Sequence, residues 1–157
     1  MPNDRTETQL EPSERNYERL LGYTMDLGYR LRCPEADKLP PGAQERYRKN
    51  QERLRVMRLQ LWPEDRDVPE GTKLYSAAIG ADGRGAVIEA EVMGQERTTL
   101  YLDHPHHPGE PYIGELGHGW FATPAEAVAA LKERYARALE KAQQKYDAVL
   151  VLEDADA

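Results

Sequence analysis

The chain has 157 residues, of which 39% are hydrophobic and 31% are charged, and its formal net charge is −7. This length allows one domain with a core of its own, and the negative charge argues against non-specific binding of nucleic acid by the whole surface. The single cysteine, Cys33, excludes an internal disulfide and a cysteine-based zinc site. No apolar run approaches the ~20 residues of a membrane span, and the N-terminus lacks the apolar stretch of a secretion signal. We therefore expect a cytoplasmic protein without a membrane contact.

Residues 1–11 are polar and show no periodicity, which predicts a flexible acidic tail. The rest is expected to form a single domain between two acidic tails. Its predicted parts are a helical part (12–61), a linker (62–71), and a sheet followed by a long helix (72–152), with a second acidic tail at 153–157.

The first helix is predicted to start at Ser13, which is a favourable N-cap residue, and to run to Leu27. Apolar and polar residues alternate from Leu21 to Cys33, as in a half-buried strand. We therefore expect Gly28 to end the helix in the left-handed conformation, with an extended segment over 29–33.

A second helix is predicted from Gly42 to Leu61, after a loop rich in proline. Its apolar seam is formed by Tyr47, Asn50, Leu54, Met57 and Leu61. The same segment carries six basic and two acidic residues, a net charge of +4 that leaves −11 for the remainder. The six basic residues are Arg46, Arg48, Lys49, Arg53, Arg55 and Arg58.

Beyond the linker the hydrophobic period changes to two, which predicts strands over 73–80, 86–93 and 97–102. Asp82-Gly83 between the first two is a hairpin signal. The sequence therefore predicts an antiparallel meander of three to four strands with one acidic, solvated face.

The C-terminal helix has the clearest start, because Thr123 and Glu126 form a capping box with Pro124 at the first helical position. It is predicted to reach about Leu152, a length of roughly 42 Å. That exceeds the width of a three-stranded sheet at ~4.8 Å per strand, so the N-terminal helices or another chain must cover its far half. Its apolar stripe comprises Val128, Leu131, Tyr135, Ala138, Leu139, Ala142, Tyr146, Val149 and Leu150.

Together these elements predict an α+β fold. It consists of two N-terminal helices, a three- to four-stranded antiparallel meander, and a long C-terminal helix that packs across both.

The junction between the last strand and the long helix resembles the end of small three-stranded DNA-binding domains, such as the arm-binding domains of phage integrases. The resemblance covers Thr72 to about Leu131, and the residues that carry it are Gly119, Phe121, Thr123, Glu126 and Ala127. Such domains bind DNA through basic strand faces. The strands here carry Glu89, Glu91 and Glu96 instead, so we do not extend DNA binding to this chain.

All four histidines lie between His104 and His118. His104, His106 and His118 are candidate metal ligands, since convergent imidazoles bind transition metals. No recognised metal-binding spacing is present, however, and Pro105 and Pro108 stiffen the backbone. We interpret the segment as a rigid, proline-rich loop between strands, with metal binding as the alternative, and we expect no cofactor.

The usual signatures of catalysis are missing from the sequence. Ser13 and Ser76 are the only serines, and neither lies in a G-x-S-x-G turn. The glycines that follow Ile79 join two strands and do not open a helix, as a phosphate-binding loop would. We therefore expect that the chain is not an enzyme.

The remaining hypotheses concern binding. We expect a small adaptor or regulatory protein that binds another protein, or a second copy of itself, through the long C-terminal helix. A nucleic-acid or nucleoprotein-binding accessory protein that uses helix 43–61 is the first alternative, and metal binding is the second. Besides the basic residues of 43–61, the candidate contacts are Arg134, Arg137, Lys141 and Lys145 on the C-terminal helix.

Overall fold

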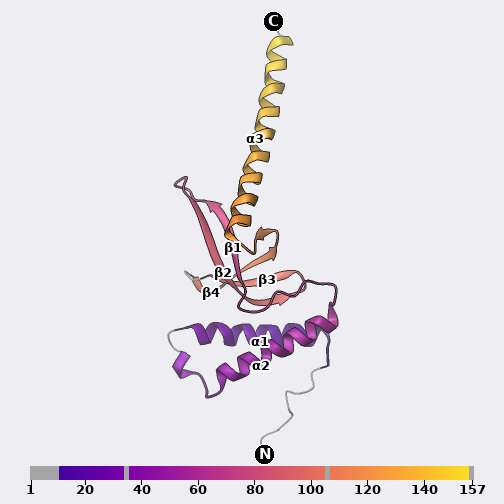
Figure 1. Cartoon of the computed structure of the whole chain (residues 1–157), viewed down its shortest axis with the longest axis vertical. Coiled ribbons are helices and arrows are strands. Elements are labelled where there is room, and N and C mark those ends of the chain that lie inside the picture. The colour runs from indigo at the N-terminus through magenta and orange to yellow at the C-terminus, as the bar shows by residue number, and fades with distance from the viewer. Residues whose placement is uncertain (1–10, 34–35, 105–106, 156–157) are drawn as a thin grey trace, which may run out of the picture.

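The computed structural model describes residues 11–33, 36–104 and 107–155, with side chains for all of these except 104 and 107–111. Three α-helices and a five-stranded sheet make up the fold (Figure 1). The elements are α1 (Glu14–Arg32), η1 (Ala36–Lys38), α2 (Ala43–Leu61), β1 (Lys73–Ile79), β2 (Gly85–Glu96), β3 (Thr99–His104), β4 (His107–Leu116), β5 (Gly119–Trp120) and α3 (Pro124–Ala155). The predicted α+β class, with two N-terminal helices, a mostly antiparallel sheet and a long C-terminal helix, is confirmed.

Helix α1 begins where the sequence predicts, because the Ser13 hydroxyl accepts a hydrogen bond from the Asn16 N–H at 3.1 Å. It does not end at Gly28 but continues to Arg32, so the predicted extended segment over 29–33 is wrong. Gly28 is helical and buried, and a Cβ atom there would lie 2.7 Å from the Tyr47 ring of α2. The glycine therefore allows two helices to approach closely and does not terminate one.

Helix α2 is confirmed over Ala43–Leu61 and packs against α1. Four of the five predicted seam residues are buried, and Leu61 packs at the edge of the same core. The rings of Tyr17 and Trp62 meet edge to face at 5.1 Å between centroids. The core cluster between the two helices comprises Tyr17, Leu20, Leu21, Leu54, Met57 and Trp62.

The sheet has the strand order β1-β2-β3-β4-β5, with antiparallel pairing from β1 to β4 and a short parallel pairing of β4 with β5. Strand β4 occupies most of the segment that we predicted to be a loop, so that prediction is wrong. His104 of β3 is paired with His107 of β4. A second core lies on the sheet and comprises Val68, Leu74, Ala90, Val92, Leu100 and Leu102.

The helices lie at opposite ends of the molecule. Figure 1 shows α1 and α2 together beneath the sheet, while α3 rises from its other end as a single rod. Helix α3 starts as predicted, with the Thr123 hydroxyl accepting from the Glu126 N–H at 3.2 Å. It then contacts chiefly β1, β2 and β5, and Ala127 is its one buried residue in the described part of the chain.

The prediction that the long helix packs across both the sheet and the N-terminal helices is therefore wrong. The sheet intervenes between them, and α3 leaves it after a few turns (Figure 1). None of the helices in the described ranges is both long enough and apolar enough to cross a membrane.

Candidate interaction surface

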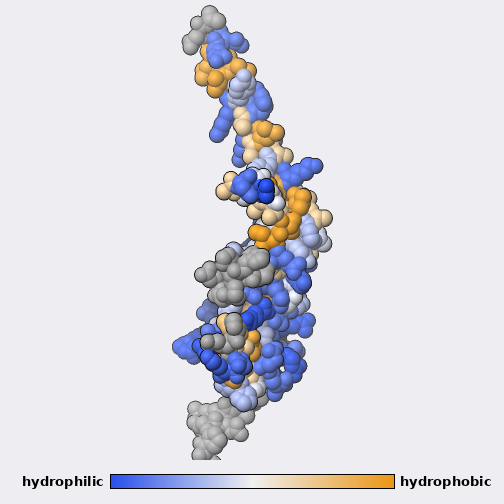
Figure 2. Space-filling view, turned by 90° about the vertical axis from the view of Figure 1, so that its left-hand side faces the viewer, coloured by the Kyte–Doolittle hydropathy of each residue, from blue (hydrophilic) through white to orange (hydrophobic). Residues whose placement is uncertain are grey.

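The apolar side chains of α3 are mostly exposed. Eight large ones have between 40% and 71% of their surface accessible, a range from Leu150 to Leu139. Figure 2 shows hydrophobic groups along the projecting rod, interrupted by hydrophilic ones. The eight are Val128, Tyr135, Leu139, Tyr146, Val149, Leu150, Val151 and Leu152. The stripe that the sequence predicted is thus present but largely uncovered.

The side chains of α3 are sorted into three lanes along the helix, because residues seven apart lie almost above one another. The apolar lane consists of Val128, Tyr135, Leu139, Ala142, Tyr146 and Val149. The acidic lane consists of Glu126, Glu133, Glu140, Asp147 and Asp154, each seven residues after the last. The basic lane consists of the predicted contacts Arg134, Arg137, Lys141 and Lys145. A helix with such sorting normally buries its apolar lane, either against the core of its own fold or, in a coiled coil, against another helix.

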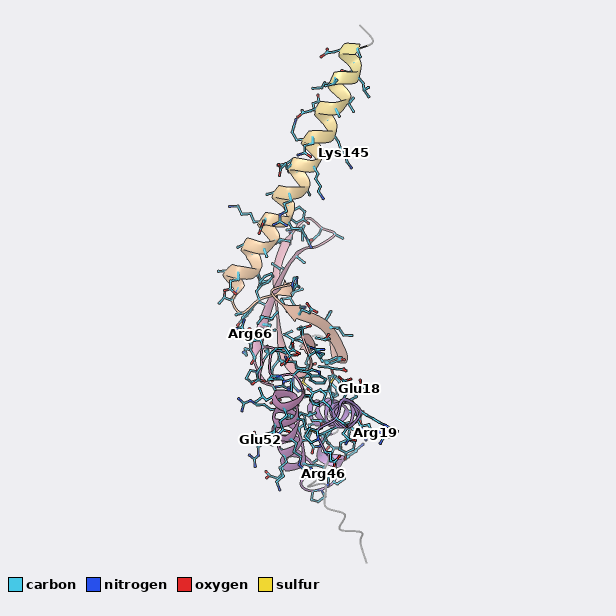
Figure 3. All side chains as sticks on the ribbon, turned by 90° about the vertical axis from the view of Figure 1, so that its right-hand side faces the viewer. Glu18, Arg19, Arg46, Glu52, Arg66 and Lys145 are labelled. Carbon is cyan, nitrogen blue, oxygen red and sulfur yellow. The ribbon has the colours of Figure 1, made fainter. Side chains whose placement is uncertain are left out.

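Half of the basic lane interacts within α3 itself. Arg137 pairs with Glu133 one turn earlier, and the guanidinium of Arg134 lies 5.5 Å from the centre of the Tyr135 ring. Lys141 and Lys145 have no ion pair with any described residue. Figure 3 places Lys145 on the part of α3 that extends beyond the sheet.

Most of the basic residues predicted on α2 are engaged by neighbouring carboxylates. Arg48 and Lys49 lie 2.9 Å and 3.9 Å from Glu45 on the same helix. Arg55 lies 2.9 Å from Asp67, and Arg58 pairs with the same carboxylate. These pairs leave two basic residues of α2 without an ion pair in the described part of the chain, Arg46 and Arg53.

The pair between Arg58 and Asp67 is the most buried of these. Burial alone would raise the pKa of Asp67, but hydrogen bonds from Arg58 and Arg55 outweigh it and hold this pKa below its ordinary value. Arg58 also donates to the Tyr17 hydroxyl at 3.4 Å. A residue that we predicted to contact a partner thus joins three segments of the fold.

The remaining surface of α1 and α2 carries both signs of charge. Figure 3 shows Arg46 and Arg19 at the same end of the molecule as Glu18 and Glu52. A surface that binds nucleic acid would be expected to present one sign over a continuous patch. The hypothesis of a nucleic-acid contact at 43–61 stays a prediction, and the geometry gives it little support.

The three candidate metal ligands are not brought together by any described contact. His106 and the side chain of His104 lie outside the described residues, and His118 is exposed in the turn before β5. The structure describes no group of three metal-ligating side chains within the ranges given above. His118 instead lines a cavity of about 200 Å³ with Arg66, Gln95 and Glu115, which the sequence did not predict.

A polar cluster between α1 and the sheet was also missed by sequence analysis. Arg32 lies 2.7 Å from Asp103 of β3 and 3.0 Å from Glu91 of β2. Burial and the charge of Asp103 raise the pKa of Tyr29, one turn before Arg32, to about 12. The cluster fixes the last turn of α1 to the sheet, and residues so far apart in sequence leave no local signal of such a contact.

Family models, curated proteins and solved structures were compared with the chain, and none of them matches it. Function must therefore be argued from the surfaces themselves. Among these surfaces, that of α3 is the least expected for a monomer, because monomeric proteins rarely expose a continuous apolar stripe and the apolar lane of α3 is exposed to solvent.

Proposed function

We propose that the chain is a small, non-enzymatic adaptor or regulatory protein that binds another polypeptide through the apolar lane of α3. The observation that carries this proposal is the exposure of the five large apolar side chains of this lane on a helix with one buried residue, Ala127, in its described length. Burying apolar surface gains about 25 cal/mol per Å², so a complementary helix or groove would be bound favourably.

The shape of the molecule supports the same proposal. Helix α3 is 32 residues long, or roughly 48 Å, and it contacts the sheet at β1, β2 and β5. Isolated helices of this kind owe most of their stability to packing of an apolar face. A helix that extends far beyond its own sheet therefore gains stability from a bound partner.

We also place the protein in the cytoplasm, where a free thiol persists. Cys33 is an exposed free cysteine. A free thiol of this kind suits a reducing compartment.

Site-specific photo-crosslinking tests the proposal. A photoreactive amino acid replaces Leu139 on the apolar lane, and in a matched chain it replaces Gln144, which is exposed on the opposite side of α3. Each full-length chain is irradiated as purified protein and in lysate of the source cell. We expect polypeptide adducts from position 139 and none from position 144. Absence of any polypeptide adduct at 139 would overturn the proposal.

A further inference from the structure

Resting on that proposed function, we infer that the polypeptide bound by α3 is a second copy of this chain, whose own α3 packs alongside in the antiparallel direction. The inference comes from the self-complementary order of residues along one seam of the helix. The seam repeats with alternating steps of four and three residues, the spacing of a two-helix coiled coil. Its members are Val128, Lys132, Tyr135, Leu139, Ala142, Tyr146, Val149 and Glu153.

The seam places apolar residues in the middle and opposite charges on either side of them, with Val128 one step before the first charge. Five apolar residues run from Tyr135 to Val149, with Lys132 before them and Glu153 after them. A helix with this order matches a reversed copy of itself, because each end then faces the end of opposite charge. The seam spans roughly 38 Å at 1.5 Å per residue, so the pairing would extend over most of the helix.

An antiparallel register centred between residues 140 and 141 gives well-matched central layers, while its outermost layers set Val128 against Glu153. Tyr135 of each copy faces Tyr146 of the other, and Leu139 faces Ala142. Lys132 faces Val149 and lies about one turn from Glu153 of the second copy, within reach of an ion pair. The register thus buries the aromatic rings against each other and pairs the terminal charges.

The positions beside the seam agree with the same register. In an antiparallel pair each flanking row meets its own counterpart on the other helix. One flank then pairs Leu131 with Leu152 and Ala138 with Lys145. The other pairs Ala129 with Leu150 and Ala136 with Gln143. No layer or flank of this register sets two charges of the same sign opposite each other.

The parallel arrangement lacks this complementarity. It would place Lys132 against Lys132 and Glu153 against Glu153 across the seam. Like charges that face each other in a helix pair repel, and the parallel arrangement would contain two such pairs. Charge order therefore selects the antiparallel copy.

The sheet leaves room for the second helix. Ala127, Leu131 and Arg134 line a cavity of about 190 Å³ between α3, β1 and the segment before α3. Val128 and Tyr135 lie on a neighbouring face of α3. They remain 48% and 49% exposed, although they belong to the half of the helix that starts at the sheet. The seam is thus accessible from its first residue to its last.

Sedimentation equilibrium of the purified full-length chain tests the stoichiometry. We expect a monomer–dimer equilibrium whose dissociation constant rises at least ~30-fold in Leu139→Glu, because each copy then buries a charge in the seam. Gln144→Glu adds the same charge on the outer face and should leave the constant unchanged within about twofold. A chain that is monomeric at all accessible concentrations would overturn the inference, as would equal effects of the two substitutions.

Distance measurement by pulsed electron spin resonance tests the direction. A nitroxide is attached to Asp154→Cys, on the acidic lane away from the seam, in a chain that also carries Cys33→Ser. The antiparallel register separates the two labelled positions by ~40 Å along the axis, at 1.5 Å per residue. Parallel helices would bring the labels to within about 20 Å, given interaxial distances near 10 Å, and would overturn the inference.

The two experiments separate this inference from the proposed function. A monomer by sedimentation whose position 139 still crosslinks to a polypeptide in lysate would overturn self-association and leave the adaptor proposal standing. A dimer in which position 139 crosslinks to the same chain would support the inference and the part of the proposed function that assigns polypeptide binding to the apolar lane. A monomer without any crosslink would overturn both.

Discussion

Arg58 of α2 donates a hydrogen bond to Asp67, which lies in the segment that leads from α2 into the sheet. The two side chains are 8% and 19% exposed, and no other ion pair described has both partners so well covered. Through Tyr17, which accepts from Arg58 and donates to the carbonyl of Gln95, the pair also connects α1 and β2. The contact therefore holds the helical layer onto the sheet.

Replacing Asp67 by asparagine should lower the free energy of unfolding by about 2–3 kcal/mol, because the substitution leaves a buried guanidinium without its counter-charge. Glu52→Gln removes the same charge from an exposed position of α2 and should change stability by no more than about 0.5 kcal/mol. Urea denaturation at pH 7 measures both. Equal losses in the two variants would contradict a structural role for the pair.

The same carboxylate predicts a pH dependence. The pKa of Asp67 is lower in the folded chain than its ordinary value, because hydrogen bonds from Arg58 and Arg55 outweigh the effect of burial. A lowered folded-state pKa contributes stability that is present above the unfolded-state value, near 4, and is lost as the pH falls through the folded-state value. The difference in unfolding free energy between wild type and Asp67→Asn should therefore shrink below about pH 4. A difference that stays constant from pH 7 to pH 3 would show that ionisation of Asp67 is not involved.

Sequence analysis succeeded where the signal is local. The capping box at Thr123 and the seam of α2 depend on neighbours within one or two turns, and both elements have the predicted start. Strand β4 was missed because its prolines argue against a strand. Its pairing with β5 is confined to Glu115 and Leu116, so Pro108 and Pro111 lie where only β3 pairs with β4. An edge strand tolerates proline, and edge position is a property of the finished sheet.

The candidate surface was predictable in part for the same reason. The periodicity of α3 gave the apolar stripe, but which part of it the fold would cover depended on where α1 and α2 pack. The pairing of Arg32 with Asp103 joins residues 71 positions apart and has no signature within either segment. A contact of the same kind explains why Arg58, which we predicted to bind a partner, is buried in the fold: it pairs with Asp67.

Two glycines of α1 give a paired test of the packing. Gly28→Ala should destabilise the chain by about 1–3 kcal/mol, because the new methyl group would lie 2.7 Å from the Tyr47 ring and 2.9 Å from Met93 Cε. Gly22→Ala meets no atom within 4 Å and should stabilise by about 0.5–1 kcal/mol through helix propensity. Thermal or urea unfolding of both variants measures the difference. Stabilisation by both substitutions would show that α1 and α2 do not approach as closely as described.

Two tyrosines give a corresponding test of buried hydroxyl groups. Tyr47 donates to a carboxylate oxygen of Glu70 at 2.9 Å, whereas the buried hydroxyl of Tyr29 has no hydrogen-bond partner in the described structure. Tyr47→Phe should therefore cost about 1–2 kcal/mol, since the bond to a charged acceptor is lost. Tyr29→Phe removes a hydroxyl that burial has already deprived of water, so stability should stay within about 0.5 kcal/mol of wild type or rise slightly.

Both substitutions remove one hydroxyl group, from α1 in Tyr29→Phe and from α2 in Tyr47→Phe. Any difference in unfolding free energy between the two variants therefore does not arise from side-chain volume or net charge. Urea denaturation at pH 7 compares their unfolding free energies directly. A loss at Tyr29 as large as the loss at Tyr47 would mean that the Tyr29 hydroxyl is hydrogen-bonded in solution. Asp103, whose charge helps to raise the pKa of Tyr29 and whose Oδ1 is buried without a partner, would then be the first acceptor to test by Asp103→Asn in the Tyr29→Phe background. Non-additive losses in that double-mutant cycle would identify the pair.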